Sequence, residues 1–179
     1  MTLRLGRRLF GIASLATLAG CGFQPVYMRT ASGKPGPAQR ELETVFVRII
    51  PDRPGQLLRQ ALQERFGSDD GTPAAYDLAV TFAVFGEGIG ITTNDLATRI
   101  RLTGTATYTL TSHDGKNTPL TTGSARAVDG VNIFDSQYFA ADLETEAKQQ
   151  DLAEKCADQI TNQLATWFRS RAQKQAQAG

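Results

Sequence analysis

The chain has 179 residues, with 19 Lys and Arg against 18 Asp and Glu, and this balanced charge argues against a nucleic-acid binder with a basic footprint. A chain of this length folds into one domain with a hydrophobic core. It has only two cysteines, Cys21 and Cys156, which is too few for a disulfide framework once the first is lipidated, as argued below.

The first twenty residues have the pattern of a secretory signal peptide. Three arginines, Arg4, Arg7 and Arg8, precede an apolar stretch over residues 9–19. A bilayer span needs about 20 apolar residues, so this stretch directs export and does not remain as a transmembrane helix. The paired arginines also leave twin-arginine export open.

The sequence Leu18-Ala19-Gly20-Cys21 resembles the lipobox of bacterial lipoproteins, whose small residues fit the processing peptidase and whose thiol receives the lipid. We therefore expect Cys21 to be the lipidated first residue of the mature chain. An ordinary signal peptide with a nearby cysteine is the alternative. Residues 21–41 are rich in Gly, Pro, Ser and charge, which predicts a flexible tether. A folded domain over residues 42–172 and a disordered tail over residues 173–179 complete the predicted organisation.

The folded domain is predicted to begin with one strand and one helix. Residues 43–50 are rich in valine and isoleucine and end at Pro51, which predicts a strand. The face of this strand that we expect to be buried carries Val45, Val47 and Ile49. Residues 52–67 predict an amphipathic helix, with Pro54 as a start signal and Gly67 as a stop signal.

Three more strands are predicted from alternating patterns, over residues 75–85, 98–111 and 118–128. The core face of the second of these would carry Ile100, Leu102, Gly104, Ala106, Tyr108 and Leu110. Asp114-Gly115 predicts a turn that joins the last two strands into a hairpin. Pro119 favours either an edge position or a strand that pairs fully only after its first residues. We interpret Gly86–Gly90 as a flexible loop, because its glycine spacing does not fit a dinucleotide-binding motif.

Residues 134–169 predict a long final helix that begins near the caps Asp135 and Ser136. Cys156 belongs to its apolar series, so we interpret it as a small core residue and not as a reactive thiol. The element order β-α-β-β-β-α predicts an α+β two-layer sandwich, in which two helices cover a four-stranded, mostly antiparallel sheet.

The residues that usually carry catalysis or bind metals give no pattern here. His113 is the one histidine and falls in the predicted hairpin turn, without the further ligands that a metal site needs. Asp69 and Asp70 fall in a Gly/Pro loop, where we interpret them as solvated residues and not as a general acid and base. We expect no catalytic residue, no metal and no cofactor.

Three sequence stretches together point to a family. They are Cys-Gly-Phe-Gln-Pro-Val-Tyr at residues 21–27, TRIRLTGTATYTL at 98–110 and DSQYFAADLETEA at 135–147. With the element order, they resemble the LptE family of lipopolysaccharide-assembly lipoproteins in its alphaproteobacterial form. The chain departs from the family pattern at Phe139, which separates Tyr138 from Ala140.

The resemblance implies a non-enzymatic protein that partners the outer-membrane β-barrel LptD. Such a protein sits in the barrel as a plug, helps the barrel assemble and contacts lipopolysaccharide on its way to the cell surface. It would be held by N-terminal acyl chains at the periplasmic face of the outer membrane. Gly22 and Phe23 follow Cys21, so no aspartate stands where it retains some lipoproteins at the inner membrane.

The predicted outward face of residues 98–111 is the candidate binding surface. It carries the threonines Thr103, Thr105, Thr107 and Thr109, which suit either a plug surface in a polar barrel lumen or a plain solvent-facing strand. Arg99 and Arg101 share this face and Arg126 lies on the return strand, and their guanidinium groups suit the phosphates of lipopolysaccharide. Arginines on a solvated surface without any ligand are the alternative.

Two other classes of function remain open from the sequence. One is a periplasmic lipoprotein that serves as an accessory subunit of an inner-membrane lipid ABC transporter. The other is a lipid-anchored hydrolase that depends on His113. Identification of the membrane partner distinguishes the first from a barrel plug, and replacement of His113 tests the second.

Overall fold

The computed structural model describes residues 36–67, 73–91, 97–132 and 138–179. The elements along the chain are α2 (Pro37–Glu43), β1 (Val45–Val47), α3 (Arg53–Phe66), β2 (Tyr76–Ile91), β3 (Ala97–Ser112), β4 (Pro119–Asn132) and α4 (Tyr138–Ala178). Cys21, Asp69 and Asp70, together with the expected helix caps Asp135 and Ser136, lie outside the described residues.

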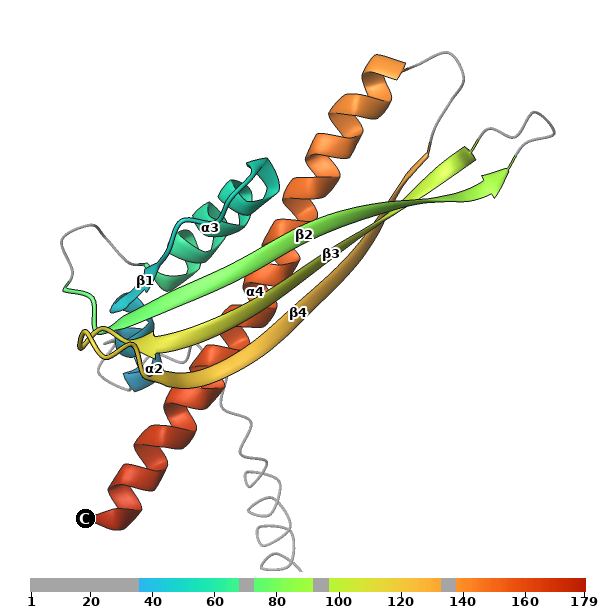
Figure 1. The fold of residues 1–179 in the computed structure, drawn as a ribbon. Helices are drawn as coiled ribbons and strands as arrows, with labels where there is room; N and C mark the ends of the chain where they lie inside the picture. Colours follow the sequence, from blue (N-terminus) through green and yellow to red (C-terminus); the bar gives the residue numbers. More distant parts are fainter. Residues whose placement is uncertain (1–35, 68–72, 92–96, 133–137) are drawn as a thin grey trace, which may run out of the picture.

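The four strands form one sheet in the order β1-β2-β3-β4. The short β1 runs parallel to β2, whereas β2, β3 and β4 are antiparallel neighbours. Figure 1 shows α3 and α4 together on one side of this sheet, with α4 crossing behind the three long strands. The predicted α+β two-layer sandwich is therefore confirmed.

The hydrophobic core lies between the sheet and the helices. The apolar face predicted for β3 is buried from Leu102 to Leu110, and Ile100 packs partly buried at its end. The matching face of β2 contributes Leu78, Val80 and Phe82, and α4 contributes Leu152, Cys156, Ile160 and Leu164. Each large aliphatic side chain removed from water in this way stabilises the fold by about 1.5–3 kcal/mol before entropy is counted.

The helix α3 has the boundaries that the sequence predicts. Pro54 lies in its first turn, and Gly67 ends it in the left-handed conformation, with φ of 65°. The Gly67 N–H donates to the carbonyl oxygen of Gln63 at 3.0 Å. An ion pair of 2.6 Å between Arg65 Nε and Asp158 Oδ1 joins α3 to α4.

The ends of the domain differ from the prediction in two places. Residues 37–41, expected in the tether, belong to α2, whose Ala38 and Leu42 are buried one helical turn apart. Residues 173–178, expected as a disordered tail, continue α4 to Ala178. Pro and Gly around residue 36 obscured the first helix, and the polar composition of the last residues obscured the second.

Two predictions on the strands are also wrong. Gly86–Gly90, predicted as a flexible loop, belongs to β2, where Gly86 and Gly88 pair with Leu102 and Ile100 of β3. Ile49 is 83% exposed and Ile50 is buried in its place, because regular pairing of β1 ends at Val47. The strand pairing ends two residues before Ile49, and the alternation of buried and exposed side chains fails at Ile49 itself.

The outer edge of β4 is occupied by glutamine side chains from α4. Gln159 bonds twice to the backbone of Arg126: its Oε1 accepts from the Arg126 N–H at 3.1 Å, and its Nε2 donates to the Arg126 carbonyl at 2.9 Å. One helical turn later, Gln163 Nε2 donates to the Ser124 carbonyl at 2.9 Å and Gln163 Oε1 accepts from Tyr108 Oη at 2.9 Å. The two glutamine side chains bond to backbone groups of β4 that a fifth strand would otherwise bond. They therefore protect this edge from pairing with the strand of another molecule.

In the part of the chain that the structure describes, no helix combines the length and the apolar composition that crossing a membrane requires.

Candidate binding surface

The face of the sheet turned away from α3 and α4 is not covered by any described element, and we call it the open face (Figure 1). On β3 it carries Arg99, Arg101, Thr103, Thr105, Thr107 and Thr109, which alternate with the buried residues. All six are exposed or partly exposed. The predicted assignment of the two β3 faces is confirmed.

Arg99 and Arg101 lie near the end of the sheet that is farthest from α2. Arg101 Nη1 is 3.6 Å from Glu87 Oε2, and both side chains are exposed, so water screens this ion pair and little free energy is tied up in it. Arg99 lies across Gly130 of β4, where an added Cβ would be 2.9 Å from Arg99 Nε. The glycine thus leaves room for the guanidinium group beside the strand.

Arg126 shares the open face but does not lie beside Arg101. It pairs with Thr105, four residues along β3 from Arg101, and this register corresponds to about 13 Å along the strand. The structure therefore places all three predicted arginines on one face, with Arg99 and Arg101 together and Arg126 apart.

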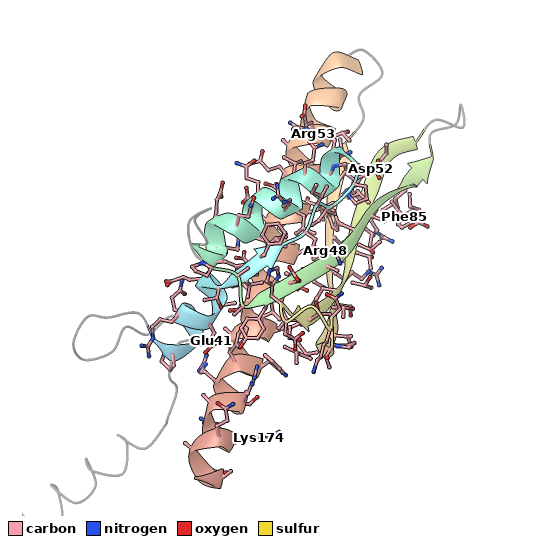
Figure 2. All side chains as sticks on the ribbon, turned by 60° about the vertical axis from the view of Figure 1, so that its left-hand side comes forward. Glu41, Arg48, Asp52, Arg53, Phe85 and Lys174 are labelled. Carbon is pink, nitrogen blue, oxygen red and sulfur yellow. The ribbon has the colours of Figure 1, made fainter. Side chains whose placement is uncertain are left out.

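Two exposed apolar side chains lie between these arginines. Phe85 of β2 and Val128 of β4 both pair with Thr103, so the three residues form one row across the sheet. Phe85 is 67% exposed and Val128 is 50% exposed. Figure 2 shows Phe85 projecting from β2 on the side away from the helices. Cations and exposed apolar groups in adjacent rows can contact an amphiphile through its anionic and its apolar parts.

Sequence reasoning did not single out Phe85 and Val128 as surface residues. The signal was present for Phe85, because it follows Val84 and so falls in the polar phase of β2, with Thr81 and Ala83. The alternation of the strand alone therefore predicts that the side chain of Phe85 points away from the core.

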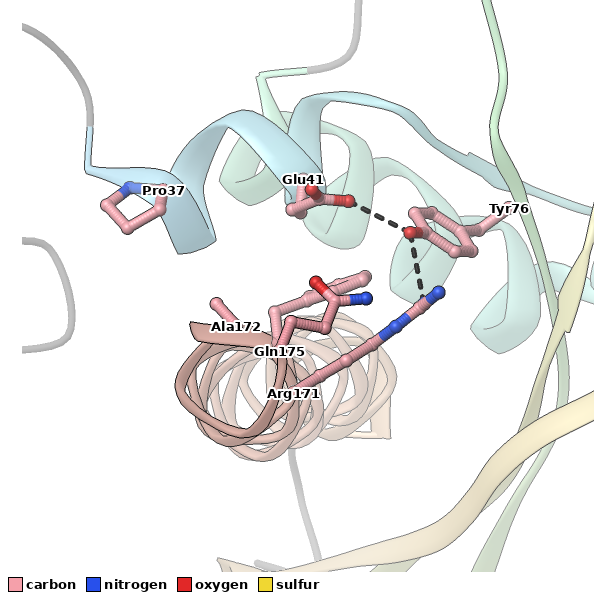
Figure 3. Close-up of a pocket in the computed structure, with 7 residues that line it drawn as sticks. Pro37, Glu41, Tyr76, Arg171, Ala172 and Gln175 are labelled. Atoms are coloured by element: carbon pink, nitrogen blue, oxygen red, sulfur yellow. Dashed lines mark hydrogen bonds between the residues drawn. The ribbon is translucent and has the colours of Figure 1, made fainter. Parts of the chain in front are cut away.

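The described residues also include one polar hollow, near the carboxyl end of α4 (Figure 3). There Tyr76 Oη donates to Glu41 Oε2 at 2.9 Å and accepts from Arg171 Nη1 at 3.2 Å. The Arg171 guanidinium also lies 5.9 Å from the Tyr76 ring centre and 5.4 Å from that of Trp167. Burial, and then the bond to Glu41, raise the pKa of Tyr76. These groups satisfy one another, so the hollow is a junction of α2, β2 and α4.

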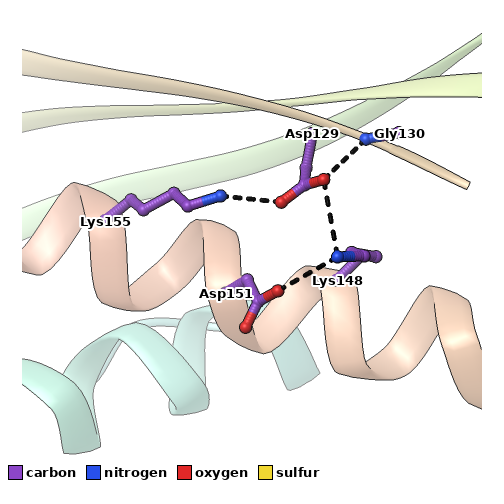
Figure 4. Close-up of polar contacts among 5 residues, drawn as sticks. All are labelled: Asp129, Gly130, Lys148, Asp151 and Lys155. Atoms are coloured by element: carbon purple, nitrogen blue, oxygen red, sulfur yellow. Dashed lines mark hydrogen bonds and ion pairs between the residues drawn. The ribbon is translucent and has the colours of Figure 1, made fainter.

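A second polar cluster joins β4 to α4 at the opposite end (Figure 4). Asp129 accepts from Lys155 Nζ at 2.7 Å and from its neighbour Gly130 N–H at 2.8 Å, and Lys148 Nζ lies 3.6 Å away. The bond from Lys155 is the main cause that lowers the pKa of Asp129. The cluster is charge-balanced within the protein, and its role is to hold the two elements together.

The remaining candidates from the sequence take structural positions. His113 lies in the β3–β4 turn, as predicted, with Nδ1 2.8 Å from Asp77 Oδ2. Cys156 is a buried core residue, as predicted, and desolvation raises the pKa of its thiol to about 11. Across the described ranges, no three His, Cys, Asp or Glu side chains gather in a way that could hold a metal ion.

Solved structures of bacterial lipoproteins have a similar fold. A lipoprotein from Caulobacter crescentus CB15 aligns with a TM-score of 0.63 at 23% identity, covering 74% of this chain and 96% of that one. A minor lipoprotein from Acinetobacter baumannii aligns with a TM-score of 0.54 at 15% identity, covering 69% and 92%. Rare lipoprotein B from Shewanella oneidensis gives 0.55 at 10% identity, covering 72% and 97%. At these identities the likeness concerns the fold.

A comparison with curated proteins gives no match. The model of the family LptE, described as lipopolysaccharide-assembly, matches residues 42–164, which is more than half of the chain. The match includes β1, α3, the whole β2–β4 sheet and most of α4. The chain therefore belongs to the LptE family of lipopolysaccharide-assembly proteins.

Proposed function

We propose that this protein is an outer-membrane lipoprotein that partners and plugs the LptD β-barrel, assists its assembly and helps deliver lipopolysaccharide to the cell surface. Membership of the LptE family supports a role in lipopolysaccharide assembly. The observation that carries the proposal is the open face, a long sheet surface of hydroxyl and guanidinium groups that no described element covers. A domain lodged in a polar barrel lumen needs such a hydrogen-bonding surface.

The plug is tested with a soluble domain that begins at Gly36. This start keeps α2, whose Ala38 and Leu42 belong to the core. Sent to the periplasm behind a cleavable signal and expressed together with LptD, the domain should co-purify with the barrel, because the specific contacts belong to the folded part. If it instead co-purifies with an inner-membrane ATPase assembly, the protein is an accessory subunit of a lipid transporter.

The open face would bind lipopolysaccharide through Arg99 and Arg101, with Arg126 contacting a separate phosphate. The Arg101–Glu87 pair is long and exposed, so a phosphate can replace the carboxylate at little cost. The apolar row of Phe85 and Val128 lies where the acyl part of the same ligand would follow. Arg99→Glu/Arg101→Glu should therefore weaken lipopolysaccharide binding at least tenfold while the barrel complex persists.

The matched control is Lys116→Glu/Lys174→Glu. It makes the same change in net charge at exposed positions in the β3–β4 turn and in the last turns of α4. Binding to lipopolysaccharide vesicles, measured at two salt concentrations, should be at least tenfold weaker for the arginine pair and unchanged for the lysine pair. Equal weakening of both would show that only net charge matters, and the arginine site would be rejected.

A further inference from the structure

The outer edge of β2 is paired over only a small part of its length. β1 pairs with Tyr76, Asp77 and Leu78, and the last bond of this pairing is the Arg48 N–H to the Leu78 carbonyl, at 3.0 Å. β2 continues to Ile91. Within the described ranges, no strand pairs with the edge of β2 beyond Leu78.

The backbone groups that face this edge follow from the register. The Leu78 carbonyl faces β1, and pairing with β3 runs without a shift from Tyr76 to Ile89. Because successive residues of a strand direct their N–H and C=O groups to opposite sides, the even-numbered residues keep this direction. The edge-facing residues beyond β1 are Val80, Phe82, Val84, Gly86 and Gly88.

The two edges of the sheet therefore differ in whether side chains bond to their free backbone groups. On β4, Gln159 and Gln163 bond to the edge-facing backbone of Arg126 and Ser124. On β2, none of the side chains that the structure describes makes a comparable bond past Leu78. An unpaired edge is a template for another strand unless a protein blocks it.

The distal part of this edge is also open to a partner. Phe85, Gly86, Glu87 and Gly88 are all exposed, although they occupy consecutive positions in a strand. Figure 1 shows β2 extending well beyond α3, so that helix does not cover this part.

We propose that Val84–Gly88 of β2 accepts an extended segment of the barrel partner as an added strand. A row of alternating N–H and C=O groups at strand spacing is satisfied by another peptide backbone. A second copy of this chain would bring the same two glycines to the contact and offer few cross-strand side-chain contacts. The occupant is therefore a different sequence, with an aromatic or β-branched residue beside Phe85 and a basic residue beside Glu87.

This inference rests on the proposed partnership with the barrel, and a pair of variants at Gly86 tests it. Gly86→Pro removes one edge-facing N–H, which an edge position tolerates without loss of pairing to β3. Gly86→Ala keeps the N–H and is the matched control, since both variants place a Cβ about 3.3 Å from Ile100 Cγ2. In the full lipidated protein expressed with LptD, Gly86→Pro should weaken the complex at least tenfold, and Gly86→Ala should bind like the wild type.

Amide hydrogen exchange of the wild-type protein gives a second reading that does not depend on the variants folding. The amides of Val84, Gly86 and Gly88 should exchange at least tenfold more slowly in the LptD complex than in the free protein. If the complex forms and these amides exchange as in the free protein, this inference is overturned, but the proposed function as a barrel plug is not. If the wild-type protein forms no complex with LptD, both this inference and the proposed function as a barrel plug are rejected. Slow exchange in the free protein at a dimeric mass identifies a second copy as the occupant, which also overturns it.

Discussion

At the scale of single residues, Asp129 is the side chain that joins the distal part of the sheet to α4. It lies opposite Leu102 in the register of β3 and β4, and it pairs with Lys148 and Lys155, which lie two turns apart on α4. The lysines and the neighbouring N–H favour the charged carboxylate, so the pKa of Asp129 is lower in the folded protein than in the unfolded chain.

This shift predicts how Asp129→Asn changes stability with pH. A carboxyl group with a lowered folded pKa contributes stability above its unfolded pKa of about 3.9, and loses that contribution as the pH falls through the folded value. Asp129→Asn should therefore lower the free energy of unfolding by about 1 kcal/mol at pH 7, since Lys155 is half exposed and its bond is partly screened. Urea unfolding at pH 7 and pH 2.5 should show that the difference from the wild type becomes smaller in acid.

The control for Asp129 is Asp151→Asn, which removes a carboxylate that pairs with Lys148 at 3.4 Å within α4 alone. It should have a smaller effect at neutral pH, because no second element is held by it. An equal loss for both variants would mean that helix charge, and not the connection between β4 and α4, explains the result.

Cys156 gives a second prediction at this scale. The soluble domain that begins at Gly36 contains Cys156 as its one cysteine. Because the thiol is buried and its pKa is about 11, a thiol reagent at pH 8 should label the folded domain at least a hundredfold more slowly than the domain in guanidinium. Rapid labelling of the folded domain would contradict the assignment of Cys156 to the core.

Residue positions were predictable where a regular pattern set the side-chain direction. The outward direction of Arg99 and Arg101 follows from alternation with Ile100 and Leu102, and the burial of Cys156 follows from helical spacing. The separation of Arg126 from Arg101 could not be predicted in this way, because it depends on which residues of β3 and β4 face each other.

At the scale of whole elements, the pairing of α4 with the edge of β4 carries a prediction. Gln159→Ala/Gln163→Ala removes the side-chain bonds to the Arg126 and Ser124 backbones and leaves those groups to water. We expect a loss of about 1–2 kcal/mol in the free energy of unfolding, faster amide exchange at Arg126, and a greater tendency to self-associate.

Asn162→Ala is the matched control for the glutamines, because Asn162 is an exposed amide residue on the same helix, between the two. Its removal should leave the exchange rate of the Arg126 amide unchanged. If exchange at Arg126 also stays slow in the glutamine double variant, the amides do not protect this edge. Analytical ultracentrifugation of the same three proteins measures the self-association.

Elements were predictable where local sequence and tertiary contacts agree. The helix α3 has a proline start, an apolar stripe and a glycine stop, and the structure keeps all three. The stretch Gly86–Gly90 has loop-like composition, yet it pairs as a strand because the side chains of Ile100 and Leu102 reach over Gly86 and supply the contacts that glycine lacks. Partners distant in the sequence decided that element, and composition could not show them.

At the scale of the molecule, the long elements separate two ends. The 41 residues of α4 correspond to about 60 Å of helix. The chain enters the domain at α2, beside Tyr76 and Arg171, whereas Glu87, Arg99 and the free part of the β2 edge lie at the other end of the sheet. From Tyr76 to Glu87 the strand advances by about 36 Å. The start of α2 and the proposed contact surfaces therefore lie at opposite ends of the domain.

Lipidation at Cys21 is the prediction that concerns the attachment of the whole molecule to the membrane. Cys21→Ser should give a precursor that keeps its leader and incorporates no labelled fatty acid, because the thiol is the acceptor atom. Cys156→Ala is the matched control, since it removes the other cysteine and should be labelled and processed like the wild type.

Two acyl chains, at about 0.8 kcal/mol for each buried CH₂, hold a protein stably at a membrane. The wild type and the control should therefore fractionate with membranes, and the absence of an aspartate after Cys21 predicts that this is the outer membrane. Fatty-acid label in Cys21→Ser would reject the lipobox, and recovery of the labelled wild type in the inner membrane would favour the transporter subunit over the barrel plug.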